Sequence, residues 1–404
     1  MGDASLRAAL IALVALSVGC ASCSSDSGEG SSPAPDAEAD ASVVDDATAG
    51  EDTEDDETDV DAPDVPEGDI TPDTTPGPNI DLEAGRADYE TFCGFCHGDD
   101  GEGYLADNAN ALSNAHFLAS ASDEFLRLST IYGRPGTPMS PWGEVQGGPL
   151  SDAQVDNIVA YIRQWQTTPS VDVDIGDVDG GALLGQSVYN VFCDDCHGAD
   201  GEGVTAVSLN NPWFHEVASD GFIRYAIEEG RPGTSMPAYA DQLNDVQIDN
   251  LVAYIRSWRT DPNAEPIEPF EPDLANAVLN PDGADAEFTL RDGRFAPAAE
   301  VEEALRAGQR FILIDARPTA DYLESHISGA TSFPFYDIDE TSIEALARDA
   351  WVITYCGCPH AVSGQAADAL LAAGFERVAV LDEGFYYWEE QGWPLTSGRE
   401  TGAE

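Results

Sequence analysis

The sequence predicts a multidomain protein in which a disordered acidic segment precedes two all-helical domains and a final α/β domain. Three observations support this prediction: a segment pattern that occurs twice, apolar β-branched runs that alternate with helical stretches toward the C-terminus, and a long acidic stretch near the N-terminus. With 404 residues, of which 42% are hydrophobic, the chain can form about two to four domains with separate cores.

The charge balance excludes a nucleic acid as the natural partner. The chain has 76 acidic residues, 17 basic residues that are all Arg, and a formal net charge of −59. Such a surface repels a phosphate backbone and favours basic protein partners. Residues 24–79 hold nineteen of the acidic residues and no Arg, among many Pro, Ser and Thr. This stretch cannot bury enough apolar surface to fold, so we predict a disordered linker over 21–79.

The first residues predict export. Arg7 precedes an apolar run, Ala8 to Val18, that is too short to span a bilayer. The segment that ends at Cys20 resembles the cleavage box of bacterial lipoproteins, although Ser17 stands where that box usually has Leu. We therefore expect residues 1–20 to be a signal peptide and Cys20 to be lipidated, which would tether a periplasmic or cell-surface protein to a bacterial membrane. A cleaved, soluble secreted form is the alternative.

An internal repeat sets the domain organisation. Residues 80–168 and 181–262 contain the same elements in the same order: a Gly, a Tyr and a Phe, then Cys-x-x-Cys-His, Asp-Gly-Glu-Gly, Gly-Arg-Pro-Gly-Thr followed by Met, and a helical segment ending in Ala-Tyr-Ile-Arg. An acidic linker, 169–180, separates the copies. A linker rich in Pro and acidic residues, 263–282, follows them and precedes a different domain over 283–398, whose alternating runs predict a parallel sheet.

The Cys-x-x-Cys-His motif is the attachment signature of c-type haem. The two thiols form thioethers with the porphyrin and the adjacent His becomes the proximal iron ligand. A redox cysteine pair or half of a zinc site would explain one copy, but two copies inside a repeated domain favour two covalently bound haems. We predict thioethers at Cys93, Cys96, Cys193 and Cys196, with His97 and His197 as ligands.

The methionine inventory predicts the second axial ligand. Apart from Met1 the chain has two, Met139 and Met236, and they occupy the same place in the repeat. A thioether there completes His/Met ligation, which raises the reduction potential relative to two His ligands. Core filling is the ordinary role of Met. The matched position of the two Met residues, after the same Gly-Arg-Pro-Gly-Thr pattern in both copies, favours a role as iron ligands. His116 and His215 do not align in the repeat, so we interpret them as surface or packed side chains.

With these motifs, both copies resemble class I cytochrome c domains, and their pairing resembles small dihaem cytochromes of bacterial respiratory chains. The resemblance covers about 170 of the 404 residues. It implies an N-terminal helix that crosses the C-terminal helix through small and aromatic residues. The residues expected in this crossing are Gly85, Tyr89, Phe92 and Tyr161 in the first copy and Gly185, Tyr189, Phe192 and Tyr254 in the second.

The two copies share one feature of the expected haem surroundings and differ in another. Arg134 and Arg231 are expected either to pair with haem propionates or to be exposed loop residues. Phe95 stands inside the first attachment motif where Asp195 stands in the second. We therefore expect the two reduction potentials to differ.

The C-terminal domain resembles a rhodanese domain in three short passages: 315–317 (Asp-Ala-Arg), 325–330 (Ser-His-Ile-Ser-Gly-Ala) and 388–395, which ends Gly-Trp-Pro-Leu. In that family a sulfur-carrying Cys follows a strand and precedes a helix. Cys356 has this place, because Tyr355 ends a strand-like run and a helix is expected to begin near Ser363. A thiolate at a helix N-terminus has a lowered pKa and can take up a sulfane sulfur as a persulfide.

The loop after Cys356 departs from the family pattern. Pro359 and Ala361 stand where the family has Gly and Arg, and Glu383 replaces a Gly near the closing motif. Without that Arg, an anionic donor such as thiosulfate loses its electrostatic anchor.

The residues of this loop leave three hypotheses open. Cys356, Cys358 and His360 form a soft cluster that could relay a persulfide to a disulfide. The same cluster could bind a thiophilic metal such as Cu(I). The third hypothesis is an inert loop on a binding domain.

Together these predictions describe an exported dihaem cytochrome that transfers single electrons between basic redox proteins and is coupled to sulfur or thiol chemistry at Cys356. Sulfurtransferase or sulfur-oxidising activity, with a sulfur species as substrate, is thus one hypothesis. A pure electron carrier, whose third domain is an inactive docking module, is the alternative. A sensor of sulfur or metal state would need a signalling partner that the sequence does not show.

Overall fold

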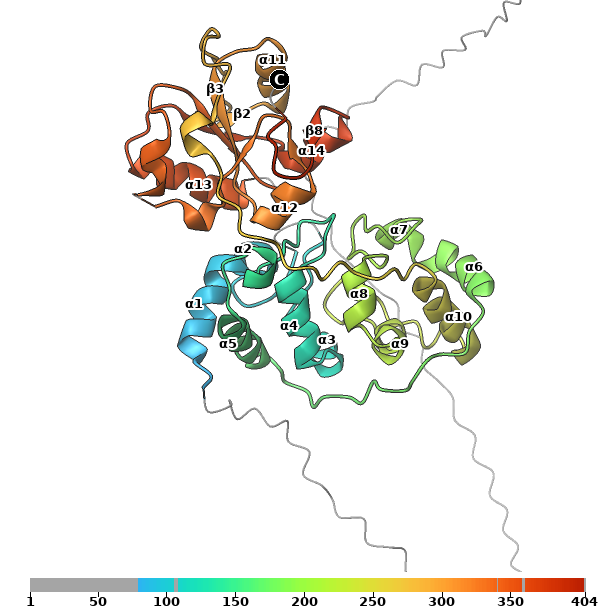
Figure 1. Cartoon of the computed structure of the whole chain (residues 1–404). Helices are drawn as coiled ribbons and strands as arrows, with labels where there is room; N and C mark the ends of the chain where they lie inside the picture. The colour runs from blue at the N-terminus through green and yellow to red at the C-terminus, as the bar shows by residue number, and fades with distance from the viewer. Residues whose placement is uncertain (1–78, 105–107, 340, 358–359, 403–404) are drawn as a thin grey trace, which may run out of the picture. The chain divides into compact units, whose positions relative to one another are not determined.

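The computed structural model describes residues 79–402 except 105–107, 340, 358 and 359. The predicted signal peptide, the lipidation site Cys20, nearly all of the acidic linker, and Cys358 lie outside the described residues. The described part confirms the predicted fold class, with two helical domains followed by an α/β domain (Figure 1). Within this part, no helix combines the length and the apolar character that a membrane crossing requires.

The two repeats have the same sequence of helices. The first contains α1 (Leu82–Phe92), α2 (Gly94–His97), α3 (Ala115–Ser120), α4 (Asp123–Tyr132), the 3₁₀ turn η1 (Glu144–Gln146) and α5 (Asp152–Arg163). The second contains α6 (Ala182–Phe192), α7 (Asp194–His197), α8 (Pro212–Val217), α9 (Asp220–Glu229) and α10 (Asp245–Arg256). Side-chain caps begin these helices at equivalent places: Ser122 and Ser219 cap α4 and α9, and capping boxes begin α5 and α10.

The terminal helices of each repeat cross at a glycine, as the sequence predicts. A Cβ atom at Gly85 would lie 2.5 Å from the carbonyl carbon of Asn157, so α1 and α5 are in backbone contact, and Gly185 makes the same close approach to α10. The Tyr89 ring lies 5.6 Å from the Tyr161 ring, centre to centre, and the second repeat matches it with Tyr189 and Tyr254 at 5.3 Å. Small residues and aromatic rings therefore fix both crossings.

The prediction for Phe92 and Phe192 is wrong in its partners. Their ring contacts are with Trp142 at 5.6 Å and with Tyr239 at 5.8 Å, respectively, and not with the tyrosines of the crossing. Both phenylalanines are the last residues of their helices, one turn beyond the crossing, which turns their side chains toward the loop before the C-terminal helix.

The third domain is built on a mostly parallel sheet with strand order β1-β3-β6-β7-β2. The strands are β1 (Val278–Leu279), β2 (Phe295–Ala296), β3 (Phe311–Asp315), β6 (Val352–Tyr355) and β7 (Val378–Leu381), with β5 (Thr331–Ser332) also paired to β3. Only β1 pairs antiparallel in this sheet of the described residues. A separate antiparallel pair joins β4 (His326–Ile327) to β8 (Leu395–Thr396). The predicted parallel α/β sheet is confirmed.

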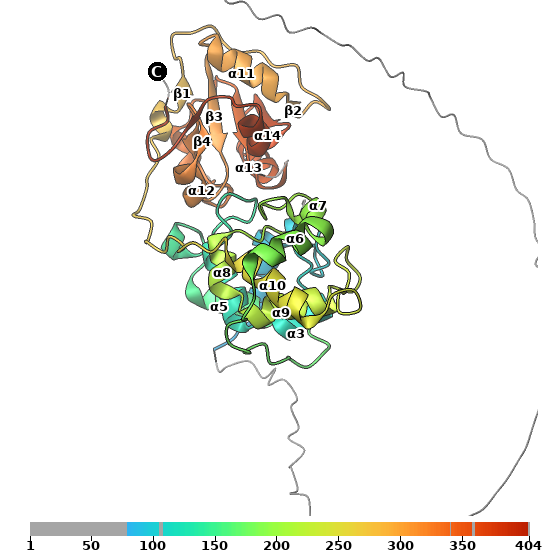
Figure 2. The ribbon, with the colours of Figure 1, turned by 90° about the vertical axis from the view of Figure 1, so that its right-hand side faces the viewer.

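Side chains of β3 alternate between two cores, one on each face of the sheet. Phe311 and Leu313 pack with α11 (Ala298–Arg306) and α14 (Gly384–Glu390). Ile312 and Ile314 pack with α13 (Ala361–Ala372) and with the 3₁₀ turn η4 (Ser342–Ala345). The ribbon in Figure 2 shows the third domain with β3 and the helices α11, α13 and α14. The remaining elements are α12 (Thr319–Glu324) and the turns η2 (Leu274–Asn276) and η3 (Phe335–Asp337).

Candidate functional sites

Each attachment motif folds into one tight turn directly after the first helix of its repeat. The amide of Cys93 donates to the carbonyl of Tyr89, and the amide of His97 donates to the carbonyl of Cys93 at 2.9 Å. The second motif repeats both bonds at Cys193 and His197. The two thiols and the imidazole of each motif therefore come from a single turn, as one porphyrin edge and its iron require.

The two motif histidines are held in one orientation by backbone carbonyls. Nδ1 of His97 lies 2.8 Å from the carbonyl oxygen of Asn110, and Nδ1 of His197 lies 2.8 Å from that of Val207. This bond places the proton on Nδ1 and leaves Nε2 with a lone pair, which is the atom that the predicted iron ligation would use. Both rings are buried, and burial lowers the pKa of each, which favours the neutral imidazole that a metal binds.

Met139 and Met236 lie in loops with identical hydrogen bonding. The amides of Arg134 and Arg231 donate to the carbonyls of Met139 and Met236, at 2.7 and 2.9 Å. Each Met amide donates in turn to a Thr hydroxyl of the same loop, at 3.2 and 3.1 Å. The repeat alignment of the two methionines thus extends to their backbone geometry, while their role as iron ligands stays a prediction.

Arg134 and Arg231 supply the test of whether this site fits a haem. Neither is an exposed loop residue: the guanidinium of Arg134 donates to the carbonyl of Gly133 and to Ser129 Oγ, and that of Arg231 donates to the carbonyl of Gly230. Burial lowers the pKa of each to about 10. Among the described residues these hydrogen-bond partners are all neutral. A buried cation is stable only beside an anion, and a haem propionate would provide one, so the residues fit the group.

The two repeats hold each other's Met loops. Nδ2 of Asn114, in the first repeat, donates to the carbonyl of Pro232 in the second, and Nδ2 of Asn211 donates to the carbonyl of Pro135, both at 2.9 Å. These residues are equivalent in the repeat, so the contact is reciprocal. The equivalent rings of Phe125 and Phe222 meet between the repeats at 4.8 Å. Each methionine loop is therefore positioned by the neighbouring repeat as well as by its own.

The histidines outside the motifs are packed side chains, as predicted. His215 is buried beside Arg256, whose Nη1 lies 3.4 Å from its Nδ1. His116 is partly buried, and its ring lies tilted against that of Tyr225 of the other repeat, with ring centres 6.0 Å apart.

Cys356 follows β6 directly, in the predicted place. Its side chain is 1% exposed, and its Sγ lies 3.1 Å from Ser363 Oγ in the first turns of α13. The helix begins at Ala361, two residues before the expected Ser363, after His360 in a left-handed conformation with φ of 71°. The strand, thiol and helix lie in the predicted order, and the reactivity of Cys356 remains a prediction.

His360 and Glu383 are engaged by other partners. Nε2 of His360 lies 2.7 Å from the carbonyl oxygen of Asp382 and 3.0 Å from its Oδ1. Glu383 accepts the amide of Ala298 at 2.8 Å and pairs with Arg291 at 2.7 Å, so this substituted position anchors the start of α11. In the described part of the chain, no three His, Cys, Asp or Glu side chains are grouped to hold a metal, and Cys358 lies outside that part.

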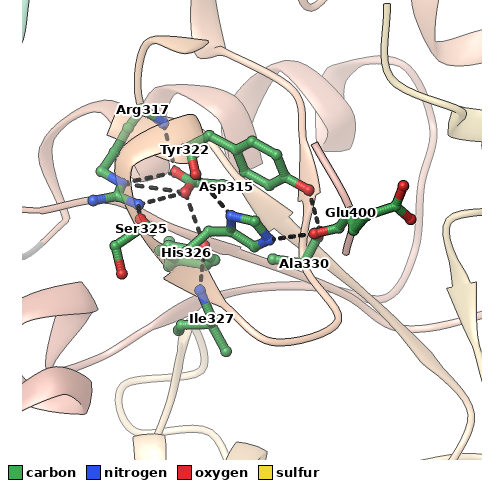
Figure 3. Close-up of polar contacts among 9 residues, drawn as sticks. Asp315, Arg317, Tyr322, Ser325, His326, Ile327, Ala330 and Glu400 are labelled. Carbon is green, nitrogen blue, oxygen red and sulfur yellow. Dashed lines mark hydrogen bonds and ion pairs between the residues drawn. The ribbon is translucent and has the colours of Figure 1, made fainter. Parts of the chain in front are cut away.

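The passages 315–317 and 325–330 form a buried polar network at the end of β3 (Figure 3). Arg317 donates to both carboxylate oxygens of Asp315, with Nη2 at 2.7 Å, and to the carbonyl of Ser325 at 2.6 Å. The hydroxyl of Tyr355 donates to Asp315 at 2.8 Å, which joins the network to the residue before Cys356. His326 stacks on Tyr322 with ring centres 3.7 Å apart. The network fixes the ends of β3 and β6 beside the thiol.

A small cavity at Cys356 has walls from two domains, and no sequence motif predicts it. The first helical domain contributes the attachment loop and the Met139 loop, and the third domain contributes the ends of β3 and β6 with α12, α13 and α14. The lining side chains are Phe95, Thr137, Pro138, Ser140, Trp142, Arg317, Pro318, Asp321, Cys356, Val362 and Tyr386. Nothing in the sequence marks Ser140, Trp142 or Asp321 as site residues, because each lies outside the motifs and the cavity forms only when the domains meet.

Contacts next to the cavity hold the two walls together. The Phe335 ring of η3 lies 6.1 Å from the Phe92 ring and 6.3 Å from the Trp142 ring. The hydroxyl of Tyr336 donates to the carbonyl of Gly147 at 3.3 Å. The aromatic residue that was expected in the helix crossing, Phe92, is thus part of the junction with the third domain.

Comparison with known proteins decides the family. Residues 81–162 and 181–255 each match the family model described as cytochrome C oxidase, cbb3-type, subunit III, and residues 297–391 match the model of the rhodanese-like domain. The chain is a tandem cytochrome c protein with a C-terminal rhodanese-like domain. Domains of the cytochrome c family hold haem c covalently and transfer electrons.

Individual relatives cover only parts of the chain. The chain is 30% identical over 180 residues to the cbb3-type cytochrome c oxidase subunit CcoP of Rubrivivax gelatinosus. The matched region covers 44% of this chain and 54% of that protein. It is 31% identical over 153 residues to the dihydro-heme d1 dehydrogenase of Pseudomonas aeruginosa, covering 32% and 31%. It thus spans about half and about a third of these two relatives. The solved rhodanese-like domain of an Anabaena protein is 27% identical, covers 26% of this chain and 78% of that chain, and has a TM-score of 0.24.

Proposed function

We propose that the protein is an exported dihaem cytochrome that takes electrons released by sulfur chemistry at Cys356 and passes them to a basic redox protein. The observation that carries this proposal is the cavity in which Cys356 of the rhodanese-like domain faces Phe95 and the Met139 loop of the first cytochrome c domain. A haem iron between an imidazole and a thioether accepts and donates single electrons. A thiol that reacts at the wall of such a domain has an electron acceptor beside it.

Residues of the chain would hold two haems in matched sites. Cys93, Cys96, His97 and Met139 form the first set, and Cys193, Cys196, His197 and Met236 form the second. The Nδ1 bonds to Asn110 and Val207 orient the histidines, and the reciprocal Asn bonds steady the methionine loops. Beside the first site, Phe95 and Trp142 present apolar surface to the cavity at Cys356.

The second cytochrome c domain offers the surface for the partner. Leu183, Leu184 and Val191 of α6 are exposed by 84, 65 and 70%, and Phe192 is also exposed. In the first domain the equivalent Phe92 packs against Phe335 of the rhodanese-like domain. The rhodanese-like domain therefore covers, in the first cytochrome c domain, the position that is exposed in the second. Exposed apolar side chains on a chain with a net charge of −59 suit a partner with an apolar patch and a basic rim.

The location of the protein follows from its N-terminal sequence. Arg7 and the apolar run to Val18 support export, and lipidation at Cys20 would tether the protein to a bacterial membrane outside the cytoplasm. The acidic stretch would then be a spacer of about 40 Å, from roughly 5–6 Å × √n for its length.

The haem content and its ligands have a direct test. The intact mass of the purified protein should exceed that of the chain by two haems, and its oxidised spectrum should show the near-infrared band of His/Met ligation. Met139→Ala and Met236→Ala should each remove about half of that band, because each site contributes one thioether to iron. A band that survives both substitutions would assign the ligands elsewhere.

The coupling to sulfur is tested by stopped-flow spectroscopy. Sulfide or a persulfide should reduce the haems of the wild-type protein, and Cys356→Ser should abolish this reduction while leaving reduction by dithionite unchanged. If both proteins respond alike to every sulfur compound, the pure carrier with an inactive docking domain is the better description. Mass spectrometry of the full chain then decides whether Cys356 carries a persulfide at all.

A further inference from the structure

We propose that the cavity at Cys356 admits uncharged S–H compounds, namely hydrogen sulfide and small alkyl thiols, and that Asp321 is the residue that selects them over anionic sulfur compounds such as thiosulfate. Asp321 would accept a hydrogen bond from the S–H group and repel an anion. This inference rests on the proposed sulfur chemistry of Cys356 and names the class of compound that reaches it.

Asp321 is a buried carboxylate with an unused acceptor in the cavity wall. Its side chain is 9% exposed, and its Oδ2 is buried without a hydrogen-bond partner among the described residues. The side chain of Ser140, from the Met139 loop, is hydrogen bonded to the carboxylate. A buried acceptor that lacks a partner is unfavourable unless a ligand supplies a donor. An S–H group in the cavity would be that donor.

The one arginine in the wall does not compensate for this charge. Arg317 is bonded through Nε and Nη2 to both oxygens of Asp315, and its remaining Nη2 bond is to the carbonyl of Ser325. Its guanidinium also lies 3.9 Å from the centre of the Phe385 ring. The charges of Arg317 and Asp315 cancel, so the net charge of the group that includes Asp321 is negative. An anionic donor therefore meets repulsion where the wider family pattern would offer an arginine.

Asp321 is ionised at neutral pH although its surroundings raise its pKa. Burial is the main cause that raises its pKa, to about 6, and Asp315 and Glu324 act in the same direction, while Arg317 and the Ser140 bond lower it. Tyr336 and Tyr386 also face it, and burial raises the pKa of both phenols, so they stay neutral. The carboxylate is thus charged at neutral pH in a poorly hydrated place, where its repulsion of a second anion is strong.

The rest of the lining favours neutral, polarizable ligands. Phe95, Pro138, Trp142 and Val362 present apolar surface to the cavity. Sulfur packs well against aromatic rings, whereas an anion would lose its hydration there without compensation. Apolar walls and a single ionised acceptor together suit a small compound with one S–H donor.

Alkylation of Cys356 tests the selection independently of the haems. The reduced full-length holoprotein is treated with iodoacetamide, which is neutral, and with iodoacetate, which is anionic, and tandem mass spectrometry reads position 356 separately from Cys358. The iodoacetate-to-iodoacetamide rate ratio at Cys356 should lie at least tenfold below that of free cysteine. Asp321→Asn should raise the ratio about tenfold. Glu324→Gln, which removes a charge from an exposed site on the same helix, should leave it unchanged.

A second measurement tests the S–H donor itself. Cys356 is first capped as a methyl disulfide, and its release by 2-mercaptoethanol, by sulfide and by anionic 2-mercaptoethanesulfonate is followed by mass. In each release the S–H proton passes to the Asp321 carboxylate or to water, and the sulfur that loses it forms a bond to one disulfide sulfur. The S–S bond breaks, and the other sulfur leaves as a thiolate that takes up a proton. Asp321→Asn should slow the neutral thiol, because an amide cannot take up the S–H proton, and speed the sulfonate, because an amide carries no negative charge. Comparison of sulfide with 2-mercaptoethanol shows which of the two sources the cavity prefers.

The outcomes separate this inference from the proposed function. Equal rate ratios in wild type and Asp321→Asn would overturn the inference, as would a Cys356 that reacts with neither reagent, because such a cavity admits no thiol. If the selectivity is found but no sulfur compound reduces the haems, the electron coupling fails and the selection by Asp321 stands.

Discussion

Replacing Gly85 with Ala should open the crossing of α1 and α5. The new Cβ atom would lie 2.5 Å from the carbonyl carbon of Asn157, against about 3.5–4.0 Å for a relaxed carbon contact, so the helices must move apart by about 1 Å. Overpacking costs about 1–3 kcal/mol, and the upper end applies here because the obstacle is backbone. Helix propensity opposes this with a gain of about 1 kcal/mol. The net loss is about 2 kcal/mol.

Hydrogen exchange of the full-length holoprotein, resolved by mass spectrometry, can measure this loss in place. Amides of α1 and α5 should exchange about 30-fold faster, since 1.4 kcal/mol corresponds to tenfold. Helices α6 and α10 of the second domain serve as the internal reference, and Gly185→Ala should reverse the pattern because its Cβ would lie 2.5 Å from the Asn250 carbonyl carbon.

Ala87→Gly is the matched control on the same helix. Ala87 is exposed, so this substitution should cost about 1 kcal/mol through helix propensity alone. If Gly85→Ala leaves exchange unchanged or slows it, propensity decides the outcome and the backbone contact between α1 and α5 does not exist.

Three further substitutions test other parts of the structure. The pKa of Asp321 is raised to about 6 from an ordinary value of about 3.9, so the native state holds this proton more tightly than the unfolded chain does. The rhodanese-like domain should therefore lose up to about 3 kcal/mol of stability as pH rises from 4 to 7. Asp321→Asn should remove that loss in urea titrations at several pH values, and an unchanged pH dependence would contradict the burial of its charge. Asn211→Ala removes the hydrogen bond to Pro135 and a cap of α8, and should lower the free energy of unfolding by about 1–2 kcal/mol. It should also weaken the near-infrared band of the first haem, although the residue lies in the second domain. Asp195→Asn should raise the potential of the second haem in a redox titration, because it removes an exposed negative charge that stabilises ferric iron beside the attachment cysteines; an unchanged potential would show that solvent screens this charge completely.

The sequence predicts best what is local or repeated. The helix that carries Gly85 and Tyr89 and its crossing with the C-terminal helix follow from spacing and from the second copy of the pattern. Cys356 is correctly placed between a strand and a helix for the same reason, since a buried run and a helical stretch are each readable from a few residues. Glu383 departs from the family pattern and keeps the fold because it finds a partner at the start of α11, and His360, in the altered loop, is held by Asp382.

What the sequence could not predict depends on contact between domains. Phe92 and Phe192 are equivalent by pattern, but Phe92 meets Phe335 from a segment more than two hundred residues away, and Phe192 remains exposed. No periodicity encodes such a contact. The unpaired oxygen of Asp321 and its bond from Ser140 belong to the same class, because each residue is unremarkable until the other wall is present.

The differences between the repeats become intelligible once that contact is known. Phe95 lies in a wall of the Cys356 cavity, whereas its equivalent, Asp195, is exposed to solvent. Cys93 is buried where its equivalent Cys193 is partly buried, and Cys96 is partly buried where Cys196 is exposed, so the attachment site next to the rhodanese-like domain is the drier of the two. An apolar aromatic residue is stable against another domain and a carboxylate is stable in water. The same position of the repeat therefore lies at a junction in one domain and on an open, acidic surface in the other, which is the asymmetry that we expect if the protein has one internal and one external redox partner.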